Sequence, residues 1–268
     1  MITGRPGPFG PGLFGGSTGP ALRTAADALL AVIFAPSCAA CGELLDAPTG
    51  GPVCARCWAS ILPLTPPLCD TCGDPLASWR TISLPLAECP RCRRATRHVE
   101  RARTIGEYDG ALRAIVHALK YEGRRSLARP LATLMRRRGA DVISCADVAV
   151  PVPLHFSRLR ERGFNQAADL ARHLGLPVVP ALRRVRATAT QTSLPAAQRH
   201  RNVRQAFAVT RRVHALHDRR VILVDDVCTT GATLEACARV LKEAGVAHVL
   251  ALTAARVVGR ATSWDKKA

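Results

Sequence analysis

The sequence predicts two modules: a small cysteine-rich module near the N-terminus and an α/β domain built around a parallel sheet. Eight of the 11 cysteines lie between residues 38 and 92, and from about residue 99 apolar strand-like runs alternate with helix-like segments. Such alternation is typical of a parallel sheet covered by helices. Apolar residues make up 48% of the 268 residues, which is enough for a buried core and excludes global disorder.

The clustered cysteines form four C-x-x-C pairs, which are Cys38/Cys41, Cys54/Cys57, Cys69/Cys72 and Cys89/Cys92. Two thiolates on one tight turn suit two corners of a zinc tetrahedron, and four pairs can close two four-thiolate sites. Gly42 and Gly73 each follow the second cysteine of a pair, where a knuckle turn often needs a positive φ. We therefore expect two structural Zn²⁺ sites.

The spacers within the module are 12 residues between the first two pairs and 16 between the last two. Both resemble zinc-ribbon spacing, which favours sequential sites over a cross-braced pairing of the first pair with the third and the second with the fourth. A redox role is less consistent, because the module lacks a thioredoxin-like βαβ pattern. Cys145, Cys228 and Cys237 are isolated, and we interpret them as small apolar fillers.

The N-terminal segment divides into a leader and a short helix. Residues 1–21 are rich in Gly and Pro, and we expect them to be disordered. The apolar stretch 28–35 could belong to a signal peptide, but Asp27 adjoins it and the leader carries little positive charge. An amphipathic helix at about 22–34, packed on the zinc module, is the better interpretation. No stretch reaches the roughly 18 apolar residues of a membrane span, so we expect a soluble, cytoplasmic protein without membrane insertion.

The second domain begins after a basic segment that follows Cys92. Strands are expected at 103–108, 147–153, 221–224 and 246–253, and helices at 112–119, 125–138, 164–174 and 232–244. Leu112, Ile115, Val116 and Leu119 share one helix face. We therefore expect a helix and double zinc ribbon at 22–98, the α/β domain at 99–258, and a flexible tail at 259–268.

Residues 221–233, VILVDDVCTTGAT, carry the clearest chemistry. A buried strand delivers Asp225 and Asp226 to the carboxyl edge of the sheet, where ligands of open α/β sheets bind. A small, hydroxyl-rich turn then opens a helix, and backbone N–H groups at such a start can hold a phosphate. Two acids beside a phosphate cradle suit a sugar phosphate. A P-loop is excluded, because the G-x-x-x-x-G-K-[ST] pattern is absent.

This segment resembles the phosphoribosyl pyrophosphate (PRPP) motif of type I phosphoribosyltransferases. Residues 118–123 (ALKYEG), 150–154 (VPVPL) and 158–166 (RLRERGFNQ) narrow the resemblance to the ComF (competence protein F) family, as do Gln191, Arg199 and Asn202. The four C-x-x-C pairs fit the same family, and the resemblance covers residues 25–258. It implies a type I phosphoribosyltransferase fold, with a five-stranded, mostly parallel sheet and helices on both faces.

The resemblance also implies roles for individual residues. Asp225 and Asp226 would hold the ribose hydroxyls of PRPP, with Asp225 also aiding the placement of Mg²⁺. The 5′-phosphate would be wrapped by Thr229, Thr230, Gly231, Ala232 and Thr233. Candidates for the pyrophosphate loop and the mobile catalytic loop are Pro153, Leu154, Arg158, Arg162, Gln191 and Arg199. Lys120 and Tyr121 end a helix, and the resemblance alone distinguishes this pair from an ordinary cap.

One position departs from the purine-salvage pattern. Those enzymes often place an Asp at the position of Thr229, where it can act on the base nitrogen, and Thr has no usable pKa for that role. This argues against a hypoxanthine/guanine-type transferase. It leaves open the orotate-like and adenine-like pocket types and a domain that binds PRPP without transferring it, and the catalytic residue stays unassigned. We interpret Cys228 as a packing residue rather than a nucleophile.

The net charge of +18 favours anionic partners. Two functions from different classes remain open: a Mg²⁺-dependent phosphoribosyltransferase, and a nucleic-acid-binding protein of DNA uptake or processing whose PRPP pocket is regulatory or vestigial. Single-stranded DNA or another nucleic acid would bind the Arg-rich surface in the second case. A GC-rich coding bias is an alternative source of the arginines. The sequence does not indicate an oligomeric state.

Overall fold

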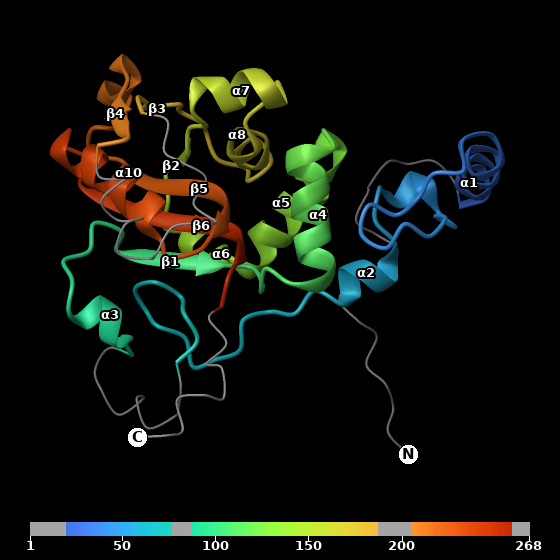
Figure 1. Cartoon of the computed structure of the whole chain (residues 1–268), viewed down its shortest axis with the longest axis horizontal. Coiled ribbons are helices and arrows are strands. Elements are labelled where there is room, and N and C mark those ends of the chain that lie inside the picture. The colour runs from blue at the N-terminus through green and yellow to red at the C-terminus, as the bar shows by residue number, and fades with distance from the viewer. Residues whose placement is uncertain (1–19, 77–86, 187–204, 259–268) are drawn as a thin grey trace.

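The centre of the molecule is a parallel four-stranded sheet. The computed structural model describes residues 20–76, 87–186 and 205–258. Across the sheet the strands are β1 (Arg101–Thr104), β6 (His248–Arg256), β5 (Arg220–Cys228) and β2 (Val148–Pro151) (Figure 1). Each neighbouring pair is parallel. The predicted α/β class is confirmed.

The fifth strand implied by the resemblance is reduced to a single bridge. Val178 bridges to Ala149 of β2, whose N–H donates to the carbonyl of Pro177 at 2.9 Å. Pro177 and Pro180 enclose this segment, and proline has no N–H with which to extend a ladder. Instead, β3 (Leu182–Arg184) and β4 (Phe207–Val209) form a separate antiparallel pair.

Helices cover both faces of the sheet. One face carries α4 (Gly110–Tyr121), α5 (Ala128–Arg138), α6 (Ala140–Ile143) and α8 (Gln166–Ala171). The other carries α10 (Ala232–Glu243) together with the β3–β4 pair. Ile222 and Val224 of β5 pack against the first group, whereas Val221 and Leu223 pack against the second. This alternation makes 221–224 a continuous apolar run, as predicted.

Several boundaries differ from the predicted ones. The first strand was expected at 103–108, but its regular ladder runs from Arg101 to Thr104. The ladder is interrupted there, because the N–H of Glu107 turns to the carbonyl of Leu62, and the chain meets β6 again only through a single bridge between Glu107 and Arg256. The helix expected at 164–174 is shortened to α8. Its start is capped by the side chain of Asn165, which accepts from the N–H of Ala167 at 3.0 Å.

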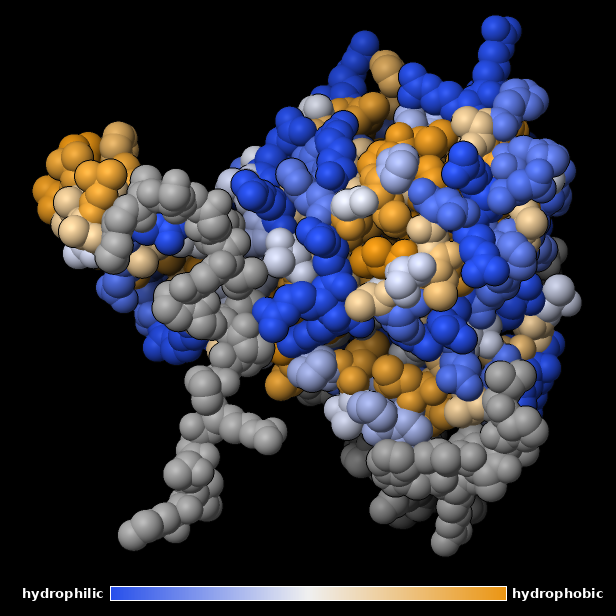
Figure 2. Space-filling view, turned by 180° about the vertical axis from the view of Figure 1, so that it is seen from behind, coloured by the Kyte–Doolittle hydropathy of each residue, from blue (hydrophilic) through white to orange (hydrophobic). Residues whose placement is uncertain are grey.

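The N-terminal helix α1 (Pro20–Phe34) contacts the first ribbon, the segment that carries Cys38, Cys41, Cys54 and Cys57. Asp27 accepts a hydrogen bond from the N–H of Thr49 in η1 (Pro48–Gly50) at 2.8 Å. Leu29, Val32 and Phe34 remain exposed. Figure 2 shows apolar surface at the end of the molecule where Figure 1 places α1. Residues 1–19 of the expected leader and the expected tail at 259–268 lie outside the described residues. Among the helices that are described, none combines the length and apolar character needed to cross a membrane.

The remaining short helices complete the two modules. They are α2 (Ala55–Ala59) in the first ribbon, α3 (Pro90–Arg93) in the second, η3 (Arg125–Leu127) before α5, α7 (Phe156–Arg162) after β2, and η5 (Arg211–Leu216) before β5. Helix α7 ends at Gly163, which adopts a left-handed conformation.

The second ribbon, which carries Cys69, Cys72, Cys89 and Cys92, contacts strand β1 through its backbone. The N–H of Ala102 donates to the carbonyl of Thr71 at 2.7 Å. Gly73 and Gly42 have the positive φ values, +71° and +76°, that their positions after a C-x-x-C pair predicted. A Cβ at Gly73 would lie 2.8 Å from the carbonyl oxygen of Ala102, whereas a Cβ at Gly42 would have no heavy atom within 4 Å. Of these two glycines, only Gly73 is therefore needed for docking.

We predict that Gly73→Ala destabilises the protein more than Gly42→Ala. Both variants incur the cost of a left-handed alanine, about 1–2 kcal/mol. Only Gly73→Ala also pushes against backbone of β1, so its unfolding midpoint in urea should be lower than that of the matched variant. Equal midpoints for the two variants would show that the close approach does not matter.

Candidate functional site

Two four-cysteine clusters are formed in the described part of the chain. Cys38, Cys41, Cys54 and Cys57 make the first, and Cys69, Cys72, Cys89 and Cys92 make the second, with ligand atoms within 4.8 Å of one another in each. The sequential pairing is confirmed, and the cross-braced alternative is wrong. Four sulfur donors at this spacing fit a tetrahedral structural zinc site.

Backbone N–H groups point at the cluster sulfurs, as a thiolate site requires. Ala40 and Cys54 donate to Sγ of Cys38 at 3.4 Å, and Cys89 donates to Sγ of Cys69 at 3.3 Å. Burial raises the pKa of Cys38, but the backbone N–H groups of Cys54, Cys41 and Ala40 outweigh it and lower that pKa to about 6. The donor set and its hydrogen bonds therefore suit a metal that binds thiolates.

The other three cysteines only partly match their predicted role. Cys228 and Cys237 are buried, as expected of apolar fillers, but Cys145 is exposed because it follows the end of α6 at the surface. Burial raises the pKa of the Cys228 thiol. A buried thiol with a raised pKa is a poor nucleophile, so the structure supports the interpretation of Cys228 as a packing residue.

Strand β5 places its two carboxylates at the carboxyl edge of the sheet. Asp226 is buried and lies 2.8 Å from Nζ of Lys120, which comes from the last turn of α4. The backbone N–H of Asp226 donates to Oδ1 of Asp225 at 2.9 Å. Lys120 thus belongs to the site, which sequence reasoning alone did not establish, since position 120 equally fits a helix-terminal cation.

The charges at this edge shift one another's protonation. Burial, and then the charge of Asp226, raise the pKa of Asp225 to about 7, while Lys120 opposes the shift. Burial alone would lower the pKa of Lys120, but Asp226 and Asp225 raise it above its ordinary value. Lys120 is the cation in direct contact with the pair of carboxylates, and the raised pKa of Asp225 shows that its charge does not fully offset their burial and mutual repulsion.

We predict that Asp225→Asn stabilises the free protein in a pH-dependent way. Between about pH 4 and pH 7 the folded state keeps a proton on Asp225 that the unfolded state has lost, so wild-type stability falls as pH rises through this window. The variant lacks this loss. It should match wild type near pH 4 and exceed it by roughly 4 kcal/mol above pH 7, because a pKa raised from 3.8 to about 7 penalises the folded state by about that much once Asp225 ionises. Urea unfolding from pH 4 to 8, with the exposed Asp218→Asn as control, measures this, and a pH-independent difference would contradict it.

The turn after β5 leads directly into α10. Thr229 is exposed, Thr230 and Gly231 are partly buried, and Gly231 precedes the helix with φ +78°. Oγ1 of Thr230 accepts from the N–H of Ala232 at 3.4 Å. The first N–H groups of a helix have no partner within it and carry partial positive charge, which suits a phosphate. The predicted set from Thr229 to Thr233 is thus brought beside Asp225 and Asp226.

The predicted pyrophosphate loop is anchored to the same edge. The N–H of Val152 donates to the carbonyl of Val224, and Nδ2 of Asn165 donates to the carbonyl of Val152 at 3.0 Å. Pro153 and Leu154 follow, and both are partly buried. This part of the prediction is consistent with a loop beside the carboxylates.

The cations of α7 and β3 gather around this loop. The guanidinium of Arg162 lies 4.7 Å from the ring centroid of Tyr121, next to Lys120. Arg158 lies close enough to Arg184 of β3 for its charge to lower the pKa of Arg184, after burial, and Arg184 in turn acts on Asp225. The sequence did not single out Arg184. Gln191 and Arg199 lie outside the described residues.

Proteins of similar sequence decide the family. A DNA utilization protein YhgH from Salmonella typhimurium is 37% identical over 193 residues, which cover 68% of this chain and 81% of that protein. Competence protein F from Haemophilus influenzae is 30% identical over 207 residues, which cover 74% of this chain and 87% of that protein. The chain belongs to the competence protein F family. Competence protein ComFC from Bacillus subtilis is 27% identical over 199 residues, which cover 73% of this chain and 80% of that protein.

Family models match both modules of this competence protein F relative. The double zinc ribbon domain matches residues 29–93 and the phosphoribosyl transferase domain matches residues 159–268. A purine phosphoribosyltransferase from Pyrococcus horikoshii Ot3 covers 48% of the chain, with 81% of its own length, at 17% identity and a TM-score of 0.30, too low to add to the assignment. The fold class is therefore a phosphoribosyltransferase-type α/β domain preceded by a double zinc ribbon.

Proposed function

We propose that this protein binds PRPP with Mg²⁺ and transfers its phosphoribosyl group to an acceptor that the sequence does not name. The observation that most supports this proposal is the sequence of polar groups at one edge of the sheet. Asp225 and Asp226 lie near the end of β5, and a hydroxyl-rich turn leads from there into α10. A phosphoribosyl transferase domain model matching 159–268 supports the same ligand class.

Each part of this edge suits one part of the ligand. Asp225 and Asp226 would accept hydrogen bonds from the two ribose hydroxyls, and carboxylate oxygens are also the ligands that Mg²⁺ prefers. The turn from Thr229 to Thr233 would hold the 5′-phosphate with its backbone N–H groups. The pyrophosphate would then face Pro153 and Leu154, beside the Arg158 and Arg162 of α7.

The proposed chemistry is departure of pyrophosphate from C1′ through a transition state with oxocarbenium character. Positive charge near the leaving oxygens stabilises the charge that develops on them. Arg158 and Arg162 stand closest in sequence to that loop, and Lys120 supplies a buried cation at the carboxylates. Mg²⁺ would add charge neutralisation of the pyrophosphate. The acceptor would approach C1′ from the face opposite the leaving group.

Calorimetric titration with PRPP in excess Mg²⁺ tests this proposal. Wild type should bind, and Asp225→Asn/Asp226→Asn should bind at least about 100-fold more weakly, because two charge-assisted contacts, each about 1.5–3 kcal/mol, are lost. Asp218→Asn, an exposed position, is the matched control and should bind like wild type. No binding by wild type, or equal binding by the double variant, would refute the pocket assignment.

A second candidate is binding of single-stranded nucleic acid. Two observations favour it: the net charge of +18, and relatives named as DNA utilization and competence proteins. Figure 2 shows that hydrophilic surface is spread widely over one face of the molecule.

We predict that single-stranded DNA binding weakens steeply with salt. Contacts to phosphates release counterions, so the logarithm of the association constant should fall linearly with the logarithm of salt concentration, by about 0.7 per phosphate contacted. Fluorescence anisotropy with a labelled oligonucleotide, at salt concentrations from about 50 mM up to about tenfold higher, measures the slope of this line. Lack of binding at the lowest salt would remove this candidate.

A further inference from the structure

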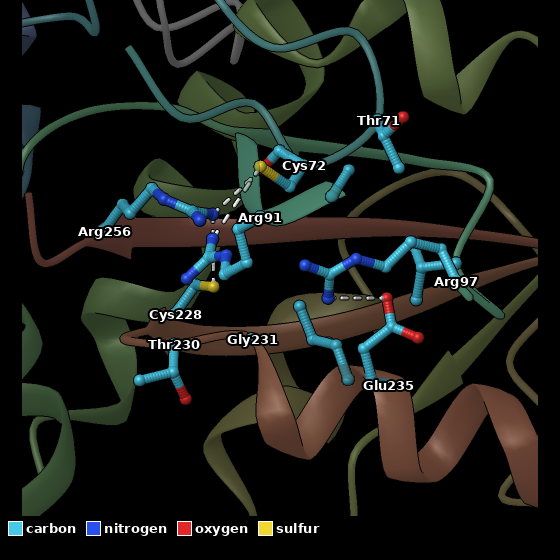
Figure 3. Close-up of a pocket in the computed structure, with 12 residues that line it drawn as sticks. Thr71, Cys72, Arg91, Arg97, Cys228, Thr230, Gly231, Glu235 and Arg256 are labelled. Carbon is cyan, nitrogen blue, oxygen red and sulfur yellow. Dashed lines mark hydrogen bonds and ion pairs between the residues drawn. The ribbon is translucent and has the colours of Figure 1, made fainter. Parts of the chain in front are cut away.

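The second zinc ribbon contacts the chain on both sides of the turn from Thr229 to Thr233, which we propose binds phosphate. A small pocket, partly open to solvent, separates the two and is lined by residues of both, among them Thr71, Arg91, Arg97, Thr230, Gly231 and Arg256 (Figure 3). Residues that the sequence places about 150 positions apart therefore share one wall. The contacts around this pocket indicate more than simple packing.

The first tie runs through Arg256 at the end of β6. Its side chain is 2% exposed, and its Nε donates to the carboxylate of Asp74 in the second ribbon. Its Nη1 donates to the carbonyl of Cys72 at 3.0 Å and to Sγ of Cys228 at 3.2 Å. One guanidinium thus joins a residue of the cysteine cluster to the residue that precedes Thr229.

The contact with Cys228 reaches the turn itself. A Cβ built on Gly231 would lie 3.9 Å from Sγ of Cys228, so the sulfur lies beneath the turn. A shift of Cys228 would therefore move the backbone that must present its N–H groups to a phosphate. Arg256 is positioned to fix Cys228 only while the second ribbon supplies its other two acceptors.

The second tie runs through Glu235 in the first turn of α10. Its carboxylate accepts from the N–H of His98 at 2.9 Å and lies 3.5 Å from Nη1 of Arg97. Both partners follow Cys92, the last cysteine of the second cluster, by only a few residues. The start of α10 is therefore tied to the same ribbon from the opposite side of the turn.

Charge explains why the ties depend on a metal. Zinc with four thiolates has a formal charge of 2 − 4 = −2, which arginines beside the cluster can balance. Arg91 lies 3.8 Å from Sγ of Cys72 and pairs with Asp74, so it joins the same network as Arg256. Loss of the metal removes this charge and loosens the ribbon that supplies Asp74 and the Cys72 carbonyl.

The geometry points to Arg256 and Glu235 as positioning residues that couple zinc at the second cluster to ligand binding at the turn from Thr229 to Thr233. The inference rests on the proposed function and adds regulation to it. Because coupling is reciprocal, bound PRPP must also hold zinc more tightly at the second cluster. The first ribbon contacts the domain elsewhere, through the carbonyls of Ile61 and Leu62 and through a hydrophobic cluster shared with α4, and is outside this coupling.

Zinc transfer to a colorimetric chelator, with and without PRPP in excess Mg²⁺, tests this inference. Two zinc ions should be released, and PRPP should slow one of the two phases at least about fivefold, within the usual range of coupling. The other phase should not change. PRPP added to Asp225→Asn/Asp226→Asn controls for direct chelation by the ligand and should leave both phases unchanged.

Two variants separate coupling from general loosening. Cys228→Ala removes only the sulfur that accepts from Arg256. It should abolish most of the slowing of zinc release by PRPP, while the zinc content stays at two per chain. Cys237→Ala, another buried cysteine on the same side of the sheet, is the matched control and should keep the effect. Glu235→Ala should weaken the effect, whereas the exposed Glu243→Ala on the same helix should not.

The outcomes distinguish this inference from the function on which it rests. If calorimetry detects PRPP binding but zinc release from both clusters is unchanged by PRPP, the coupling is refuted and the proposed function stands. If PRPP does not bind, both fall. An equal PRPP effect in Cys228→Ala and wild type would also overturn the role of Arg256.

Discussion

Removal of the second zinc site is expected to destabilise the protein far more than removal of the first. In Cys69→Ser/Cys72→Ser, the ribbon loses its metal, and the buried Arg256 loses the ordered acceptors that hold it. Uncompensated burial of a charge costs about 3–5 kcal/mol. For a chain of this size, about 3 kcal/mol lowers the melting temperature by roughly 6–12 °C.

The matched variant is Cys38→Ser/Cys41→Ser, which removes the first site. Cys41 is exposed, and no buried arginine of the α/β domain depends on it among the described contacts. Metal analysis should find one zinc in each variant and two in wild type. Differential scanning calorimetry should give the lower melting temperature for the second-site variant. A larger shift for the first-site variant would contradict the docking described for the second ribbon.

Loss of Lys120 should produce the second large effect. Lys120→Met leaves Asp225 and Asp226 without the cation that balances them, and both groups of the pair are largely buried, with side chains 15% and 12% exposed. Removing one partner of a buried pair typically costs about 3–5 kcal/mol. We expect a loss of about 3 kcal/mol at pH 8, and a smaller loss at pH 5, where a carboxylate with a raised pKa takes up a proton.

A double-mutant cycle separates the ion pair from the packing of the lysine stem. Asp226→Asn in the Lys120→Met background should restore much of the lost stability, because it removes the carboxylate left unpaired. Urea unfolding of the four proteins gives the coupling energy. Strictly additive effects would mean that Lys120 and Asp226 do not interact in solution.

Local patterns were sufficient to predict the elements that carry the chemistry. The cysteine spacing predicted both four-cysteine clusters, since a C-x-x-C turn brings its own two sulfurs together regardless of the rest of the fold. The face of Leu112, Ile115, Val116 and Leu119 is buried, as its helical spacing indicated. Asp225 and Asp226 lie at the strand end because four apolar residues of β5 precede them.

Contacts between distant segments could not be predicted in this way. Arg256 carries no signal in the sequence, and only the fold brings it to Asp74, Cys72 and Cys228. Lys120 equally fits a helix cap, and its pairing with Asp226 depends on how α4 packs beside β5. The fifth strand, which the resemblance implied, is only a single bridge at Val178, because Pro177 and Pro180 on either side of this segment limit its hydrogen bonding. The same prolines are visible in the sequence, but their effect depends on which strand they face.

The crystal structure of the protein with PRPP and Mg²⁺ bound is the most direct test of the central claim. The account predicts the 5′-phosphate within hydrogen-bonding distance of the backbone N–H groups between Thr230 and Thr233. It also predicts the ribose hydroxyls at Asp225 and Asp226, and the pyrophosphate facing Pro153 and Leu154. Ligand density elsewhere on the molecule, with this edge of the sheet empty, would contradict it.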